Sequence, residues 1–307
     1  MKQLVILSGK GGTGKTSLAA AFAHLASQSN LANQVVLADA DVDAANLELV
    51  LQPRLLEQEE FRGGQVAVID GNTCASCGDC EAVCCFDAIN YADGLYAVDP
   101  IACDGCAACV YQCPSESISM QKQVAGKFCV SESRYGPLYH ASLYPGRENS
   151  GKLVTLVKQR ARLRALDEDR QLVLVDGPPG IGCPVISAAS GADLALIVVE
   201  PTVAGVHDMK RILQTTEHFR LPALVCINKA DIYLLGSKLI EAYCWDNDFE
   251  IAGKIPFDEA VTEAMVHGEP VTAYRPEAPA SLAIVDVWRS VVEYLSIQNI
   301  PSSLQEI

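Results

Sequence analysis

The 307-residue chain has few basic side chains and no long apolar run. Lysine and arginine number 23 against 38 aspartates and glutamates, which gives a formal net charge of −15 at pH 7. Such a surface repels polyanions, because nucleic-acid binding depends on basic side chains that neutralise phosphates. No apolar segment approaches the ~20 residues that a membrane-spanning helix needs. The composition therefore disfavours nucleic acids and membranes as partners.

The first residues also lack the pattern of a secretory signal or a transit peptide. We therefore expect a cytoplasmic protein. Thirteen cysteines in a reducing compartment indicate metal clusters and free thiols rather than a disulfide framework. Half of the residues are apolar, and the length is sufficient for one large α/β domain and a small second domain.

Eight of the cysteines form two runs with identical C-x2-C-x2-C-x3-C spacing. The runs are Cys74, Cys77, Cys80 and Cys84, then Cys103, Cys106, Cys109 and Cys113. This is the pattern of a two-cluster ferredoxin, in which the first three thiolates of a run bind one cluster and the fourth binds the other. A zinc ribbon is the alternative, but it needs two cysteine pairs rather than two quartets.

The spacing predicts two [4Fe–4S] clusters in a small α+β domain of ferredoxin type. The first would be held by Cys74, Cys77, Cys80 and Cys113, and the second by Cys84, Cys103, Cys106 and Cys109. Cys85 follows the first run where Pro114 follows the second, so Cys85 competes with Cys84 as a ligand.

The N-terminus predicts a different site, a phosphate-binding P-loop. Residues 2–7 are typical of a buried strand and 17–26 of a helix, and the loop between them contains Gly11, Gly12, Thr13, Gly14, Lys15, Thr16 and Ser17. In that context backbone N–H groups and the helix N-terminus bind phosphate, Lys15 reaches the β- and γ-phosphates, and Thr16 binds Mg²⁺.

A second lysine in the loop, Lys10, resembles the signature lysine of the MinD/ParA/Mrp class of P-loop ATPases, which includes the nitrogenase iron protein. The resemblance implies a homodimer in which Lys10 reaches the partner's nucleotide. It also implies a mostly parallel sheet flanked by helices, formed by residues 1–60 and 123–307, with the ferredoxin domain inserted at 61–122.

Two further segments resemble the switches of that class. By this resemblance Asp39 belongs to the Mg²⁺ shell and Asp41 orients the attacking water, since phosphoryl transfer chiefly needs charge neutralisation and positioning. After a predicted strand at 172–175, Asp176 would hold Mg²⁺ through water. Gly180 would let the backbone approach the γ-phosphate.

The base-binding residues are also assigned by resemblance. Asn228 begins an N-K-x-D run that would read guanine in GTPases, but in this class the asparagine contacts adenine. Pro256 follows another predicted strand and resembles the loop that closes on the base. ATP with Mg²⁺ is therefore the expected nucleotide, and ATP hydrolysis the expected activity.

Other features leave alternatives open. The segment 281–297 has one basic residue, Arg289, and we expect its apolar residues to pack on the sheet rather than to bind a membrane. His140 is interpreted as a structural histidine or as a contact to a partner's cofactor. Cys183 either packs at a helix start or, with Cys129, bridges two subunits through a third cluster.

Three functions remain. One is an ATP-gated redox switch that passes electrons to an unidentified partner protein. The second is an assembly or carrier ATPase for iron–sulfur or other metal clusters, and the third a positioning ATPase whose clusters sense redox state. Ligands at all eight positions favour retained clusters, and the acidic surface disfavours the third function.

Overall fold

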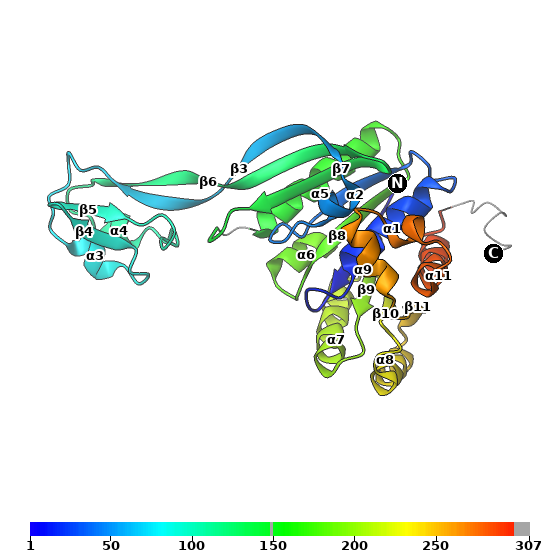
Figure 1. The fold of residues 1–307 in the computed structure, drawn as a ribbon. Helices are drawn as coiled ribbons and strands as arrows, with labels where there is room; N and C mark the ends of the chain where they lie inside the picture. The colour runs from blue at the N-terminus through cyan, green and yellow to red at the C-terminus, as the bar shows by residue number, and fades with distance from the viewer. Residues whose placement is uncertain (148–149, 298–307) are drawn as a thin grey trace. The chain divides into compact units, whose positions relative to one another are not determined.

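The structure is a computed structural model that describes residues 1–147 and 150–297 (Figure 1). Among these residues, nine strands form one sheet. They are β1 (Lys2–Ser8), β2 (Val35–Asp39), β3 (Arg54–Ile69), β6 (Ile118–Ser133), β7 (Gly136–Leu143), β8 (Leu172–Pro179), β9 (Leu194–Val199), β10 (Ala223–Asn228) and β11 (Glu250–Ile255). Their order in the sheet is β11-β10-β9-β1-β8-β2-β7-β6-β3.

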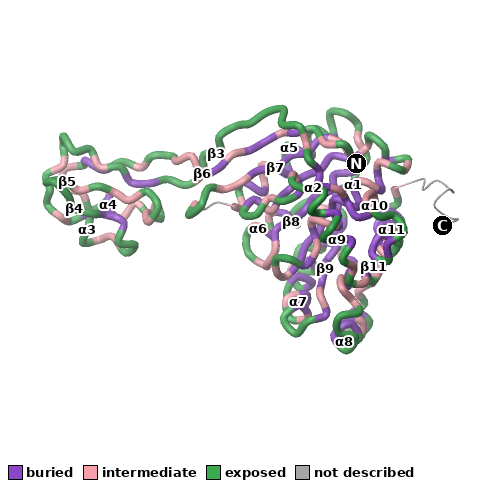
Figure 2. Tube along the Cα trace, in the orientation of Figure 1, coloured by how far each residue is buried: buried purple, intermediate pink, exposed green. Residues whose placement is uncertain are grey.

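The sheet is parallel at every pairing from β11 to β7. Its central strands are buried, as the purple segments of Figure 2 show, because helices pack on both faces. Strands covered on both faces consist of continuous apolar runs, and β1 and β9 have this composition. The predicted α/β fold with a mostly parallel, helix-flanked sheet is confirmed.

The helices around this sheet begin after its strands. They are α1 (Lys15–Ser27), α2 (Leu47–Leu51), α5 (Ser150–Asp167), α6 (Cys183–Ala189), α7 (Val203–His218), α8 (Leu234–Asp246), α9 (Glu259–Val266), α10 (Val271–Tyr274) and α11 (Pro279–Tyr294). Phe22 of α1 contacts Trp288 of α11, with ring centroids 4.9 Å apart. This contact joins α11 to the main core, as expected for segment 281–297, although Leu282 points outward and is 47% exposed. None of the described helices is long and apolar enough to cross a bilayer.

The segment after residue 133, for which the sequence suggested no role, forms part of the main sheet. A two-residue turn joins β6 to β7, and β7 pairs with β2. Gly136 begins β7 with φ 129°, and a Cβ there would lie 2.7 Å from the carbonyl oxygen of Val35. Glycine is therefore required where β7 enters the sheet.

Among the described residues, a second compact unit consists of residues 59–127 and 143–147, and residues 1–58, 128–142 and 150–297 form the first. The second unit contains α3 (Asp79–Val83), the antiparallel pair β4 (Ile89–Ala92) and β5 (Leu95–Val98), and α4 (Ala108–Gln112). Strands β3 and β6 each have residues in both units. The proposed insert limits at residues 61 and 122 stay a prediction.

Candidate functional sites

The P-loop lies between β1 and α1, which begins at Lys15. The Lys15 side chain is buried, and its Nζ donates to Ser8 Oγ at 3.0 Å. The first N–H groups of α1 lack intrahelical acceptors and are available to a bound anion. Thr13 is also buried, and its Oγ1 has no hydrogen-bond partner among the described residues. The loop thus offers a cation and unpaired donors to phosphate.

Two carboxylates lie beside the P-loop at the carboxyl ends of neighbouring strands. Asp39 of β2 and Asp176 of β8 are partners in the parallel register, and both are fully buried. Thr16 Oγ1 donates to Asp176 Oδ2 at 2.6 Å, whereas Asp176 Oδ1 has no partner in the described part of the chain. The three residues predicted to surround Mg²⁺ are therefore adjacent.

Electrostatics at this position favour a bound cation. Burial raises the pKa of Asp176 to about 6, although Thr16 and Lys15 act in the opposite direction. Burial, reinforced by the charge of Asp176, raises the pKa of Asp39, and burial likewise raises that of Asp41. Three crowded carboxyl groups with raised pKa values are suited to a divalent cation, which would neutralise their charge.

The loop predicted as the first switch is tied to the end of β2 by the side chain of Asp39. Asp39 accepts hydrogen bonds from the backbone N–H groups of Asp41 at 3.1 Å and Leu47 at 3.0 Å. These bonds tie the loop from β2 to α2 to the end of β2. In the second switch, Gly180 has φ 92° and donates its N–H to the carbonyl of Ser8 at 2.9 Å. The segment predicted as the second switch thus adjoins the P-loop, which follows Ser8.

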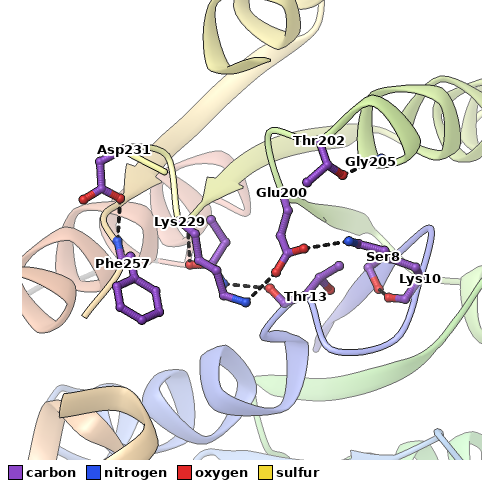
Figure 3. Close-up of polar contacts among 10 residues, drawn as sticks. Ser8, Lys10, Thr13, Glu200, Thr202, Gly205, Lys229, Asp231 and Phe257 are labelled. Carbon is purple, nitrogen blue, oxygen red and sulfur yellow. Dashed lines mark hydrogen bonds and ion pairs between the residues drawn. The ribbon is translucent and has the colours of Figure 1, made fainter. Parts of the chain in front are cut away.

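Lys10 is paired within its own chain. Its Nζ lies 2.8 Å from Glu200 Oε2, and Lys229 Nζ lies 2.5 Å from Glu200 Oε1 (Figure 3). Burial would raise the pKa of Glu200, but hydrogen bonds from the two lysines outweigh it and keep that pKa below its usual value. Glu200 was not predicted from the sequence. A signal was available, because Glu200 directly follows β9, and β9 pairs in parallel with β1, the strand that leads into the P-loop.

Asn228, one of the two predicted base-binding residues, lies next to the P-loop. Asn228 Nδ2 donates to the carbonyl of Thr13 at 2.7 Å. A Cβ on Gly14, which has φ 97°, would lie 2.4 Å from that nitrogen, so only glycine fits there. Asp231 accepts the N–H of Phe257 at 2.7 Å and thereby fixes the loop that contains Pro256 (Figure 3).

In the second unit, the two cysteine runs have the same local backbone conformation. The residue before each short helix has positive φ, 87° at Gly78 and 64° at Ala107. The third cysteine of each run is buried in the core of the unit. The fourth cysteine ends each helix in an extended conformation, with φ/ψ of −76°/106° at Cys84 and −72°/109° at Cys113. The repeat in sequence is therefore a repeat in structure.

The cysteines assigned to the second cluster share one cavity. Cys84, Cys103, Cys106 and Cys109 line it together with mostly apolar side chains. The N–H of Ala88 points to Cys84 Sγ at 3.4 Å, and hydrogen bonds to ligand sulfur are a feature of iron–sulfur sites. The donor set and its apolar surroundings fit a [4Fe–4S] cluster.

Cys113, assigned to the first cluster, lies in surroundings that favour its thiolate form. The Ser117 N–H lies 3.4 Å from its sulfur, and the hydroxyls of Ser117 and Ser115 lower its pKa to about 7. Among the described residues, no three His, Cys, Asp or Glu side chains converge on a single metal ion. A four-iron cluster does not need such convergence, because each thiolate binds a different iron.

The remaining candidate residues have simpler environments. His140 is buried between Ser131, 2.9 Å from its Nε2, and Glu48, 3.1 Å from its Nδ1, which favours the structural interpretation. Cys183 is exposed at the start of α6, whereas Cys129 is buried in β6. A buried Cys129 argues against a third cluster bridging two subunits. Cys85 is exposed and outside the cavity of the second cluster.

Comparison with known proteins agrees with the nucleotide site. The family model for the CobQ/CobB/MinD/ParA nucleotide binding domain matches residues 4–271. The chain belongs to this family. It is 34% identical over 257 residues to an uncharacterised protein of Methanocaldococcus jannaschii, covering 83% of this chain and 84% of that protein. The MinD–Mg-ADP structure from Pyrococcus horikoshii shares the fold, with a TM-score of 0.57 at 19% identity over 97% and 99% of the two chains.

Two shorter matches concern iron–sulfur proteins. A ferredoxin-like protein from Azotobacter chroococcum is 39% identical over 51 residues, which is 15% of this chain and 78% of that protein. An iron–sulfur cluster carrier protein from Aquifex aeolicus is 28% identical over 136 residues, covering 39% and 37% of the two chains. As a MinD/ParA-family member, the chain is an NTP-binding P-loop protein.

Proposed function

We propose that the chain is an ATP-hydrolysing homodimeric switch whose second unit is a two-[4Fe–4S] ferredoxin that transfers electrons to a partner protein. The observation that carries this proposal is the connection between the units. Strands β3 and β6 belong to the nine-stranded sheet and also enter the unit that contains both cysteine runs. A unit connected through two sheet strands is suited to respond to changes in the ATPase.

The nucleotide chemistry follows from the P-loop geometry. Lys15 and the α1 N-terminus would bind the β- and γ-phosphates, and Thr16, Asp39 and Asp176 would hold Mg²⁺ directly or through water. The metal would neutralise charge on the phosphates. Asp41, tethered to Asp39 through its N–H, would orient the attacking water. Asn228 and the Pro256 loop would enclose adenine.

Dimer closure requires Lys10 to change partners. In the isolated chain it is bound to Glu200, so it must leave this carboxylate to reach the phosphates of a second subunit. ATP supplies the competing negative charge. We therefore propose that exchange of Lys10 from Glu200 to the partner's ATP accompanies closure, and that the switch movement is transmitted to the ferredoxin unit through β3 and β6.

The similarity to the Aquifex aeolicus cluster carrier supports a second candidate, an ATPase that delivers clusters. Permanence of the clusters separates the two functions. Retained electron carriers keep their iron in the presence of an apo-acceptor and ATP, whereas a cluster carrier loses it. The buried third cysteines and the apolar cavity around the second set favour retention.

Anaerobic purification tests the proposal. Protein with both clusters should contain about eight iron atoms and about eight acid-labile sulfides per chain. The reduced form should give the EPR signal of two interacting S = 1/2 centres, and the iron content should be unchanged after incubation with ATP and apo-ferredoxin. Zinc in place of iron, or ATP-dependent loss of iron to the acceptor, would contradict electron transfer by retained clusters.

A further inference from the structure

A separate cavity of about 400 Å³ lies in the first unit. It is lined by Gln3 near the start of β1, by Thr155, Lys158, Gln159 and Arg162 of α5, and by the end of α6, including Ser187. The P-loop follows the other end of β1, about 16 Å away along the strand. The cavity is therefore distinct from the nucleotide site, and its volume is in the range of small-ligand sites.

The charge of this cavity is opposite to that of the chain. Lys158 and Arg162 lie one helical turn apart on α5, and within the described part of the chain no aspartate or glutamate lines the cavity. A carboxylate beside the Gln3 backbone, that of Asp193, accepts the N–H of Gln3 at 2.7 Å and pairs with Lys2 at 3.8 Å. Two cations without a lining carboxylate, in a protein of net charge −15, attract an anion.

Two residues that line the cavity have unused donors. Gln3 is 2% exposed, and its Nε2 has no hydrogen-bond partner within residues 1–147 and 150–297. Lys158 Nζ donates to the carbonyls of Ser187 at 2.7 Å and Ser190 at 2.6 Å, which leaves one of its three protons. A buried amide without an acceptor is unfavourable, so a ligand oxygen beside Gln3 would relieve a cost already present.

Lys158 has the electrostatics of an anion contact. Burial, assisted by the nearby Arg162, lowers its pKa to about 8. An anion would act in the opposite direction and raise that pKa again, because it stabilises the ammonium form. The two carbonyls at the end of α6 hold the ammonium in place, so its position is set before a ligand arrives.

We propose that this cavity binds the carboxylate or phosphate group of a small solute through Lys158, Arg162 and Gln3. The two groups share the same oxyanion chemistry. The Lys158 ammonium and the Arg162 guanidinium supply charge, and the Gln3 amide supplies a buried directional donor. The solute's remaining atoms would lie against Ile186 of α6.

Isothermal titration with inorganic phosphate and with citrate tests this site. The protein is saturated with Mg·ADP to occupy the P-loop, and ionic strength is kept constant. The variants are Gln3→Leu and Arg162→Gln, with Lys152→Gln as control, since Lys152 is exposed on the same helix and outside the cavity. Each cavity variant should weaken binding by about five-fold or more, because it removes at least one hydrogen bond to the anion. The control should bind like wild type.

The Gln3→Leu variant also distinguishes a loss of anion binding from a loss of folding stability. Replacing an unpaired buried amide by an apolar side chain of similar size should leave the melting temperature unchanged or raised. Binding of only phosphate or only citrate supports the site and assigns its ligand group. Equal affinities in all four proteins, or no binding of either anion to wild type, would overturn the proposal.

Discussion

Replacing Glu200 with glutamine should tighten the ATP-dependent dimer. Glu200 holds Lys10 at 2.8 Å and Lys229 at 2.5 Å in the isolated chain. The proposed closure breaks the Lys10 pair in each subunit. Glutamine removes the charge that competes with the partner's ATP for Lys10, while it preserves the shape of the side chain. The substitution therefore destabilises the open state, which contains the Lys10–Glu200 pair, and leaves the closed state, which lacks this pair, unchanged.

The magnitude follows from the exposure of the pair. The Lys10 side chain is 39% exposed and that of Glu200 12%, so solvent screens the attraction and each pair contributes about 1 kcal/mol. Closure breaks two such pairs, one in each subunit, which amounts to about 2 kcal/mol. The dimer dissociation constant should therefore fall about 30-fold, since 1.4 kcal/mol corresponds to a factor of ten.

Sedimentation velocity with ATP measures this constant, in an Asp41→Ala background in which hydrolysis should be slow. Glu241→Gln is the matched control, because it breaks an exposed pair with Lys254 (2.6 Å) that involves neither Lys10 nor Glu200. Its dimer constant should equal that of the background. A Glu200→Gln dimer that is equally strong or weaker would refute the exchange of Lys10 between Glu200 and ATP.

Three further predictions concern the nucleotide, the metal and the clusters. Lys15→Ala should abolish nucleotide binding, whereas Asp41→Ala should bind ATP but hydrolyse it slowly. Equilibrium binding measures the first effect and phosphate release the second. Equal loss of ATP binding in both variants would contradict the assigned roles. Burial raises the pKa of Asp176 to about 6, so below about pH 6 the carboxyl is mostly protonated and protons compete with the metal, whereas above it the buried carboxylate is charged and the metal neutralises that charge. Mg²⁺ should accordingly raise the melting temperature more at about pH 7.5 than at about pH 5, and equal shifts at both pH values would count against Asp176 as part of the metal site. Cys113→Ser should remove one cluster, about four iron atoms, and Cys85→Ser none; similar iron loss in both would favour Cys85 as a ligand.

Local patterns predicted the nucleotide elements well, because they reside in contiguous sequence. A buried strand, a glycine-rich loop and a helix were expected in that order around Lys15, and the structure has β1 and α1 on either side of the loop. Asp39 and Asp176 were assigned to one Mg²⁺ site by resemblance to the switches of the family, and the structure brings them together because they end neighbouring parallel strands. Repeated cysteine spacing similarly implied repeated backbone geometry.

Long-range pairing could not be read from the sequence. Glu200 binds a lysine 190 positions earlier in the chain, and no spacing rule connects the two. Strand β7 was missed because glycine, proline, tyrosine and histidine within eight residues do not form an apolar run, although the strand is buried against β2. Leu282 was expected to pack, but its position on α11 faces solvent.

Spectroelectrochemistry of the iron–sulfur clusters tests most directly whether ATP acts on them. The potentials are measured in wild type and Lys10→Ala, each with and without ATP. ATP should shift the potential of wild type by about 59 mV for each ~1.4 kcal/mol of coupling, and it should leave Lys10→Ala unchanged because that variant binds ATP without closing. Identical potentials in all four samples, with equal rates of iron chelation, would contradict coupling between the ATPase and the ferredoxin unit.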